Sequence, residues 1–306
     1  MADVATDFQY DLDEILQGAQ LPALPQSAIR LLELSQDPKN GPVEFAISIE
    51  TDPGLAGQVL KFVNSAYFGF SREISSVKLA ITMVGIRTIK NFALWSAVFS
   101  LMPNPKCGPF DLKTLWQDSL RRALFARSFG KLLGMREAEE PFAAALLQDM
   151  AVPLLAKQLP EEYAQLLELR EQGKVRLSQL ELERFGWTHY DAAARMGQQW
   201  NLPEEFITLV QHHTTLDEML NTPGTPPGQL AVALSALLPA GADDAWHECD
   251  RFERAFQALC PAGGPTIGEF LEKIDHEFAE FAPLMKIATP AKSLAASYQE
   301  STQPTA

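Results

Sequence analysis

The sequence predicts an all-α fold, and three observations support this prediction. Apolar residues recur at helical spacing along most of the 306-residue chain, and no segment shows the strict alternation of a half-buried strand. Proline and glycine gather at short breaks, at 102–109 and 222–228. We therefore expect three parts: an N-terminal helical subdomain at 1–105, a second helical subdomain at 106–216 packed against it, and a helical extension with a flexible tail at 217–306.

The first part combines a proline-defined turn with capped helices. Leu-Pro-Ala-Leu-Pro at 21–25 predicts a rigid entry to a helix, because each proline fixes its own backbone and moves the preceding residue away from helix. Asp52 and Pro53 begin a helix expected over 53–68, with proline in its first turn. Ser76 is the expected N-cap of the helix that follows.

Asn64, Ser65 and Gly85 receive structural interpretations. Short polar residues at a helix end usually bond to the nearby backbone, so Asn64 and Ser65 are predicted to act locally. Gly85 is predicted to mark a close approach of two helices, since no glycine-rich nucleotide loop surrounds it.

The second part carries an apolar run over 142–155 that is interrupted by Gln148 and Asp149. We expect this run to be buried, and a buried polar pair is costly unless it finds hydrogen-bond or charge partners. Two interpretations stay open: a polar bridge between core helices, or a catalytic site that has lost part of its metal chemistry. Pro153 suits the first turn of a new helix.

Helices are expected in the extension near 229–238, 246–259 and 266–286. The residues from about 287 to 306 are rich in alanine, serine, threonine and proline, which predicts a frayed tail. These helices could supply a docking face or a dimer contact.

Composition excludes several classes of function. The chain has 25 basic and 39 acidic residues, and a net charge of −14 repels phosphate backbones and anionic membranes. We expect no direct nucleic-acid binding and no membrane insertion, and Trp116, Trp187 and Trp200 are predicted to pack in the core rather than stack on bases. The absence of a signal-peptide pattern and of C-x-x-C spacing favours the cytoplasm.

Several ordered segments of the chain resemble the HDOD family of bacterial signalling proteins. They are Leu-Pro-Ala-Leu-Pro at 21–25, Asp-Pro-Gly-Leu at 52–55, the stretch 61–67 that contains Asn64 and Ser65, Ile-Ser-Ser-Val at 74–77, and the Val-Gly dipeptide that ends at Gly85. The order of these segments is more specific than any one motif. The resemblance covers roughly residues 15–215 and implies a multi-helix HDOD fold.

The stretch of about 108–216 resembles the HD domain of metal-dependent phosphohydrolases and cyclic-dinucleotide phosphodiesterases, with departures at ligand positions. Leu-Trp-Gln-Asp-Ser-Leu at 115–120 resembles the helix that carries the first histidine ligand, which puts Asp118 at that position. Gln148 replaces the histidine of the His-Asp pair, and Asp149 remains.

Later segments of the HD resemblance supply histidines. The resemblance implies a polar pocket with a degenerate metal site, formed by Asp118, Gln148, Asp149, His189, His212 and His213. Local interpretations exist beside it: Asp118 can pair with Arg122 one helical turn away, Thr188 and Asp191 form a capping box, and histidines favour a helix C-terminus.

We expect from these observations a non-catalytic signalling or scaffold protein without a cofactor, which acts through regulatory protein partners or a homodimer contact. The resemblance implies roles in motility, biofilm, stress or cyclic-dinucleotide regulation. One alternative is a metal-dependent phosphohydrolase or phosphodiesterase that uses the metal-ligand set Asp118, Asp149, His189, His212 and His213. Another is a cyclic-dinucleotide receptor whose phosphates would meet Arg121 and Arg122.

Overall fold

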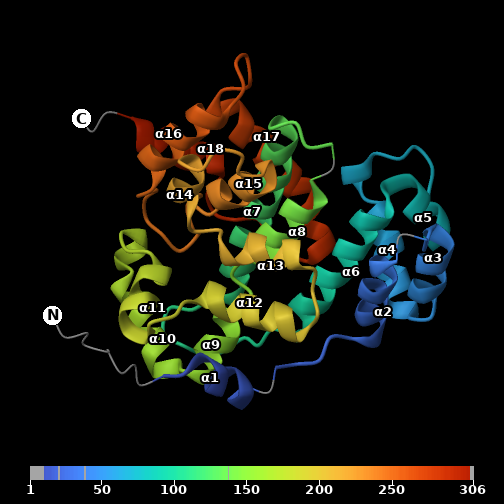
Figure 1. Cartoon of the computed structure of the whole chain (residues 1–306). Helices are drawn as coiled ribbons and strands as arrows, with labels where there is room; N and C mark the ends of the chain where they lie inside the picture. Colours follow the sequence, from blue (N-terminus) through green and yellow to red (C-terminus); the bar gives the residue numbers. More distant parts are fainter. Residues whose placement is uncertain (1–9, 20, 38, 137, 304–306) are drawn as a thin grey trace.

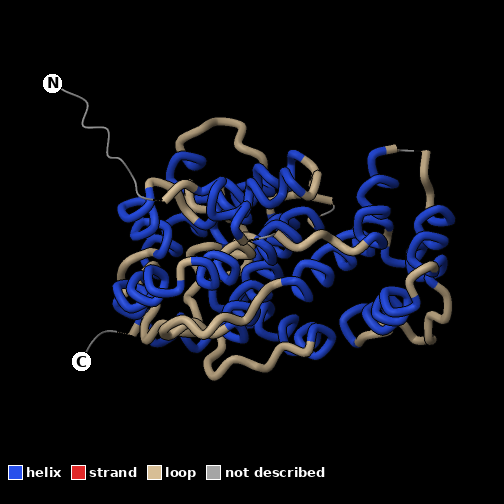
Figure 2. Tube along the Cα trace, turned by 90° about the horizontal axis from the view of Figure 1, so that it is seen from below, coloured by secondary structure: helices blue, strands red, loops and turns tan. Residues whose placement is uncertain are grey.

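The computed structural model describes residues 10–303 except 20, 38 and 137, and its ordered elements there are helices without any strand (Figure 1, Figure 2). The predicted all-α class is confirmed. The N-terminal segment without a signal-peptide pattern and the last three residues of the predicted tail lie outside the described residues. Among the helices of the described chain, none has the length and apolar content needed to cross a membrane.

The N-terminal helices form a small lobe, with the exception of the first, which lies against α9 of the main body (Figure 1). The elements are α1 (Leu12–Gly18), α2 (Gln26–Gln36), α3 (Pro42–Glu50), α4 (Pro53–Val63), η1 (Ala66–Phe68), α5 (Val77–Val84) and α6 (Ile86–Leu101). The long helix α6 leads from the lobe to the body, where it packs against α8 (Glu139–Leu147).

Two predicted caps of this lobe are confirmed, and the helix between them is shorter than expected. The Asp52 carboxylate accepts the amide of Leu55 at 3.0 Å, and the Ser76 hydroxyl accepts the amide of Leu79 at 3.2 Å. The helix predicted over 53–68 ends at Val63, and a short 3₁₀ turn follows. Asn64, the residue after the helix, leaves the helical backbone conformation, with φ of −82° and ψ of 9°.

Asn64 makes the predicted bond to the nearby backbone and also acts over a longer range. Its side chain donates to the carbonyls of Leu60 and Ile74 at 2.9 and 2.8 Å, and its Oδ1 accepts the amide of Ile74 at 2.7 Å. The amide therefore clamps both ends of the loop between α4 and α5. Local capping by Ser65 is wrong, because its buried hydroxyl finds no partner among the described residues.

Gly85 joins α5 to α6 for a conformational reason. Its φ of 91° lies in a region that favours glycine, and it ends one helix and begins the next. A Cβ added there would have Thr88 Oγ1 as its nearest described neighbour, at 4.0 Å. The predicted close approach of two helices is therefore wrong, and the backbone angle is what requires glycine.

The second part is built around α7, a 21-residue helix whose middle is fully buried. Its elements are α7 (Leu112–Leu132), α8, α9 (Val152–Gln158), α10 (Pro160–Leu169), η2 (Glu171–Gly173), α11 (Leu177–Phe185), α12 (His189–Gln199), α13 (Glu204–Gln211) and α14 (Leu216–Leu220). The apolar run at 142–155 is buried as predicted, and it divides into α8 and α9 at a turn over 148–151. Pro153 lies in the first turn of α9, as expected.

The three tryptophans pack as predicted, and two of them also tie the N-terminal segment to the body. The ring nitrogen of Trp187 donates to the carbonyl of Tyr10, and that of Trp200 donates to the carbonyl of Pro22. Trp116 stacks on Phe99 with ring centroids 3.8 Å apart. The proline-rich segment at 21–25 is thus held by a tryptophan of the second part.

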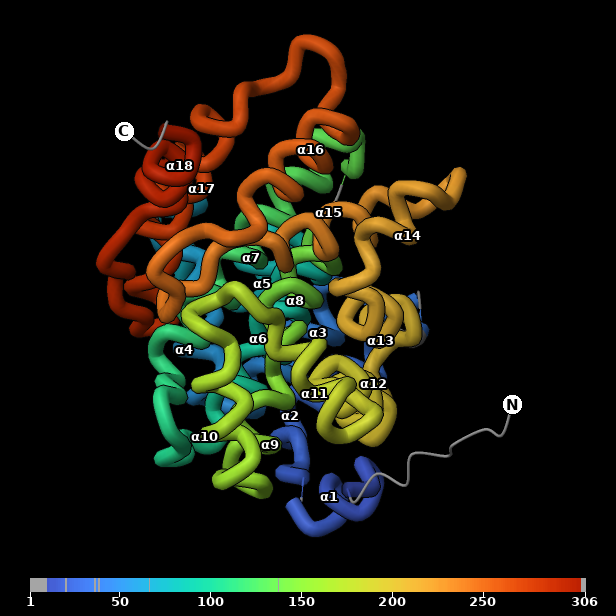
Figure 3. The backbone as a smooth tube through the Cα atoms, turned by 90° about the vertical axis from the view of Figure 1, so that its left-hand side faces the viewer, coloured from blue at the N-terminus to red at the C-terminus, as the bar shows by residue number. Residues whose placement is uncertain are grey.

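The C-terminal helices gather at one end of the body, over α7 (Figure 1, Figure 3). They are α15 (Pro227–Ser235), α16 (Cys249–Leu259), α17 (Ile267–Phe281), η3 (Ala282–Met285) and α18 (Leu294–Thr302), within a few residues of the predicted ones up to η3. Phe281 at the end of α17 contacts the rings of Phe62, Tyr67 and Phe142. The extension therefore belongs to the core that joins the lobe to the body.

The predicted frayed tail is wrong for the residues of α18. Leu294 is fully buried, and the carboxylate of Asp275 on α17 accepts the amides of Leu294 and Ala295 at 2.9 and 3.0 Å. Ser293 caps the same turn. A carboxylate from another helix thus satisfies the first-turn donors, which composition alone could not reveal.

Candidate functional site

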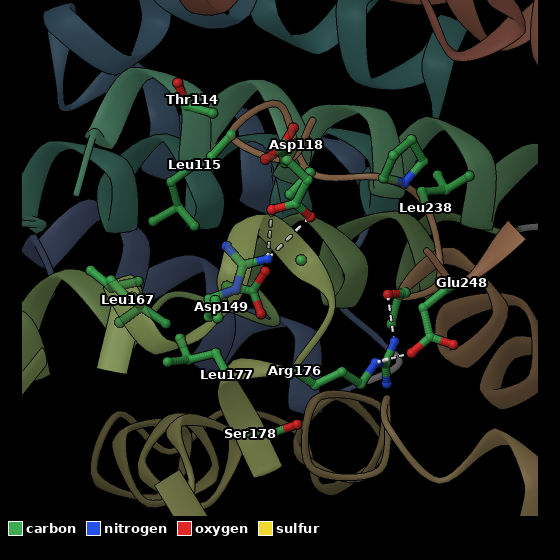
Figure 4. A pocket seen from close by; sticks show the side chains of 18 of the residues that line it. Thr114, Leu115, Asp118, Asp149, Leu167, Arg176, Leu177, Ser178, Leu238 and Glu248 are labelled. Carbon is green, nitrogen blue, oxygen red and sulfur yellow. Dashed lines mark hydrogen bonds and ion pairs between the residues drawn. The ribbon is translucent and has the colours of Figure 1, made fainter. Parts of the chain in front are cut away.

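A cavity of about 560 Å³ lies between α7, the 148–151 turn, the α10–α11 connection and the non-helical segment 236–248. Figure 4 shows Asp118, Asp149, Arg176 and Glu248 around this hollow. The predicted pocket residues line it with the exception of His212. Its size is that of a small-molecule site.

Asp149 lies at the centre of an ionic cluster. Its Oδ2 forms an ion pair with the guanidinium of Arg122, and its Oδ1 lies 3.3 Å from Nε2 of His189 and 3.8 Å from Nε2 of His213. Burial opposes ionisation of Asp149, but the charges of Arg122 and His189 outweigh burial and hold its pKa well below its usual range. Asp149 is therefore a carboxylate with its counter-ions already in place.

His189 is held between two carboxylates. Its Nδ1 donates to Glu181 at 2.6 Å, and the same glutamate accepts the His189 backbone amide at 2.9 Å and the hydroxyl of Tyr163 at 2.7 Å. Burial lowers the pKa of His189, whereas the charges of Glu181 and Asp149 raise it by more, to about 10. His189 is therefore an imidazolium at neutral pH.

The two histidines at 212–213 have different environments. His213 is buried, and its Nδ1 donates to the carbonyl of Val210 at 2.6 Å, which turns Nε2 toward Asp149. Burial lowers the pKa of His213 to about 4, so this imidazole is neutral. His212 is exposed at the end of α13, and its predicted place in the pocket is wrong because adjacent residues at a helix end point in different directions.

Asp118 has a structural partner from the extension. Both of its oxygens accept the backbone amide of Gly241, at 2.9 and 3.0 Å, and Arg122, the predicted partner of Asp118, forms its ion pair with Asp149 instead. Burial raises the pKa of Asp118 to about 6, against the opposing effects of Arg122 and the Gly241 amide. Asp118 thus connects α7 to the segment 236–248.

The raised pKa of Asp118 makes a signed prediction about stability. The folded protein binds a proton at Asp118 that the unfolded chain has lost, so this residue lowers stability as the pH rises from about 4 to about 6. We expect the free energy of unfolding of Asp118→Asn, taken relative to that of the unaltered protein, to be about 2 kcal/mol higher at pH 7.5 than at pH 4.5. Urea unfolding at both pH values measures this difference, and Asp250→Asn, at an exposed site, is the matched control. A difference that does not change with pH would contradict the prediction.

The remaining predicted residues separate into buried and structural ones. Gln148 is 1% exposed and lines the cavity, and its Oε1 finds no partner among the described residues. Arg121 donates to the carbonyl of Lys292 and is no lining residue of the cavity, so it does not join Arg122 as a phosphate contact there. Thr188 and Asp191 form the predicted capping box.

Glu181 is the site residue that sequence reasoning missed. It stands eight positions before His189, in a segment that reads as an amphipathic helix with exposed glutamates. The packing of α11 against α12 brings its carboxylate to the imidazole. One sequence signal could have indicated such a residue: a buried histidine at a helix start needs a hydrogen-bond partner for its Nδ1.

The metal site that an HD-like fold implies fits this chain only in part. Asp149, His189 and His213 offer three ligand atoms within 4.8 Å of one another, and Glu181 and the Val210 carbonyl hold the two imidazoles as outer-shell partners of a metal site do. The donor set stops there: Asp118 is bonded to Gly241, residue 148 is an amide, and Arg122 occupies the second oxygen of Asp149.

Comparison of the sequence with protein-family profiles identifies the family of this chain. The profile of the HDOD domain matches residues 21–216, more than half of the chain. This chain belongs to the HDOD family. An uncharacterised protein of Treponema pallidum (strain Nichols) is 25% identical over 197 residues, which are 63% of this chain, and the chain spans 38% of the length of that curated relative.

Solved structures confirm the HDOD fold. An HDOD domain protein of unknown function from Geobacter sulfurreducens has a TM-score of 0.67 and 20% identity, and the match covers 90% of this chain and 99% of that one. A candidate phosphohydrolase from Shewanella amazonensis SB2B has a TM-score of 0.67 and 19% identity over 89% and 97% of the two chains. A candidate signal transduction protein from Marinobacter aquaeolei VT8 has a TM-score of 0.60 and 19% identity over 89% and 58%.

Proposed function

We propose that this HDOD chain is a non-catalytic regulatory module that acts through protein contacts. The observation that carries the proposal is the ion pair between Arg122 and Asp149, the carboxylate left from the His-Asp pair. The protein supplies its own cation at the position where a metalloenzyme of this fold would use a metal.

The charges of the cluster oppose a metal ion in the same place. Arg122 and the protonated His189 balance Asp149 and Glu181. A divalent cation on Oδ1 of Asp149 would therefore lie close to the guanidinium and would have to replace the proton of His189. Two other residues of the predicted pocket add no good ligand: Asp118 accepts the Gly241 amide, and Gln148 carries an amide, which is a poor metal ligand. The proposal assigns the cavity to structural specificity or to a small regulator whose binding shifts a conformational equilibrium.

A metal-dependent phosphohydrolase is the second candidate, because one observation favours it. Asp149, His189 and His213 form a group with the donor types and separations of a three-ligand site. The Shewanella protein of the same fold also bears a phosphohydrolase name. This candidate requires a metal ion to bind Oδ1 of Asp149 beside the positive charge of Arg122 on Oδ2.

Metal binding in Arg122→Met separates the two candidates. We expect the unaltered protein to hold manganese or zinc below stoichiometry, and Arg122→Met to bind manganese roughly tenfold more tightly, because a buried positive charge beside the ligands is removed. Elemental analysis of chelator-free protein and titration calorimetry give the values. Arg30→Met, in a surface ion pair with Glu33, is the control and should change nothing.

A hydrolysis assay gives the result that would contradict the non-catalytic assignment. Stoichiometric metal in the unaltered protein, together with hydrolysis of bis(p-nitrophenyl) phosphate that Asp149→Ala abolishes, would establish the enzyme instead. No hydrolysis above the level of Asp149→Ala supports the regulatory module.

A further inference from the structure

Exposed apolar side chains concentrate on two neighbouring helices of the N-terminal lobe. Four of the large hydrophobic residues that are exposed in the described chain belong to α3 and α5, and the other three, Leu169, Leu182 and Leu220, lie on separate helices. The four are Val43 at 43%, Ile47 at 60%, Leu79 at 42% and Met83 at 49% exposure. We call these four residues the α3/α5 face.

Helical geometry explains why the α3/α5 face points away from the core. Val43 and Ile47 are four residues apart on α3, opposite the buried side that includes Phe45 and Ile49. Leu79 and Met83 repeat the same spacing on α5, opposite its buried side. The two helices pack against each other at the outer edge of the lobe (Figure 1). Each helix thus has one apolar side for the core and a second for solvent.

The face is unusual for a soluble protein. Single exposed apolar residues are common, whereas several on adjacent helices indicate a binding surface. Among the described residues, the other helices of the lobe contact α3 and α5 from their buried sides: α2 and α4 pack on α3, and α4 and α6 pack on α5. The cavity around Asp149 is formed by other elements.

A second copy of the chain is a poor occupant of this face. Four partly exposed side chains offer on the order of a few hundred Å², whereas a stable interface buries roughly 800 Å² on each partner. Each copy also carries a net charge of −14, which opposes self-association. Glu44 and Glu50 are exposed on α3 beside the apolar pair, and Lys78 is exposed on α5 beside Leu79, so the acidic edge of the face is the one on α3. The face therefore favours an apolar partner surface with basic residues at its edges.

We propose that the α3/α5 face binds an amphipathic helix of a partner protein, with an apolar stripe at i, i+3, i+4 and i+7 and lysine or arginine beside the stripe. This inference rests on the part of the proposed function that assigns the output to protein contacts. Two exposed pairs at i, i+4 spacing on packed helices match the repeat of such a stripe. The acidic edge on α3 sets the charge of the partner.

A synthetic peptide tests the proposal with the full chain. The probe is a helical leucine–lysine peptide of about 18 residues with that stripe, and the matched probe has the same composition with scattered leucines. We expect the first to bind, with protection from hydrogen exchange at α3 and α5, and Ile47→Glu or Leu79→Glu to weaken binding roughly tenfold or more. Leu182→Glu, at an equally exposed leucine on α11, should bind as the unaltered chain does.

Each other result overturns the proposal. Equal binding of both peptides, protection elsewhere, or equal loss in Leu182→Glu would show that the face is not the site. A doubled mass in sedimentation that Ile47→Glu abolishes would assign the face to a second copy. Thermal melting checks that the variants fold. Metal binding and hydrolysis are measured in the same variants, so a failure of peptide binding does not decide whether the protein is an enzyme.

Discussion

Replacing Asp149 with alanine is expected to lower the free energy of unfolding by about 3–5 kcal/mol, because it leaves the buried charges of Arg122 and His189 without their shared counter-ion. Urea unfolding at pH 7 measures the loss. The same chemistry at the surface costs far less, so Asp217→Ala, which breaks an exposed pair with Arg251, should lose no more than about 1 kcal/mol.

A second substitution shows whether the uncompensated charge is the cause. In Asp149→Ala with Arg122→Met, the guanidinium disappears together with the carboxylate, so the double variant should be more stable than Asp149→Ala alone. Losses that simply add would show that Arg122 and Asp149 do not stabilise each other. Equal losses in Asp149→Ala and Asp217→Ala would also contradict the ionic cluster.

Glu181→Ala is expected to cost a similar amount, about 3–5 kcal/mol, since one fully buried carboxylate accepts the Tyr163 hydroxyl and both the ring and the backbone N–H of His189. The measurement is again urea unfolding. Glu183→Ala, two residues further along the same helix and exposed, is the matched control and should stay within about 0.5 kcal/mol.

The pKa of His189 gives this prediction a readout that packing alone would not change. It should fall from about 10 toward its ordinary value in Glu181→Ala, as measured by NMR titration of the imidazole. A raised histidine pKa stabilises the fold below the unfolded value of 6.5, and that contribution is lost as the pH rises through about 10. Stability should therefore fall less steeply over this range in Glu181→Ala. An unchanged His189 pKa would show that Glu181 is not its main partner.

Much of the fold could be predicted because its signals are local. The caps at Asp52 and Ser76, the capping box at Thr188 and the helix start at Pro153 each depend on residues within one turn. Two features that local signals did not predict depend on long-range partners. Asn64 bonds to Ile74 across a loop, and the tail becomes α18 because Asp275 of another helix accepts its first amides.

The candidate site shows the same division. The resemblance placed Asp118, Gln148, Asp149, His189 and His213 around one cavity, where the structure also has them. It also placed His212 there, which the structure leaves exposed outside the cavity. The resemblance did not predict which charged side chains of the cavity form ion pairs with each other. Asp118 accepts the amide of Gly241 in the extension, and Arg122 forms its ion pair with Asp149 rather than with Asp118 on the same helix.

The sequence by itself determined the all-α class, the HDOD family and the residue types at positions 118 and 148, since periodicity, motif order and residue type are properties of the chain. Only the tertiary structure decided that Arg122 and Glu181 complete the cluster around Asp149 and His189, and that the α3/α5 face stays uncovered. The reason is physical: ion pairs and burial depend on distances between helices, and these are set by the packing of the whole core.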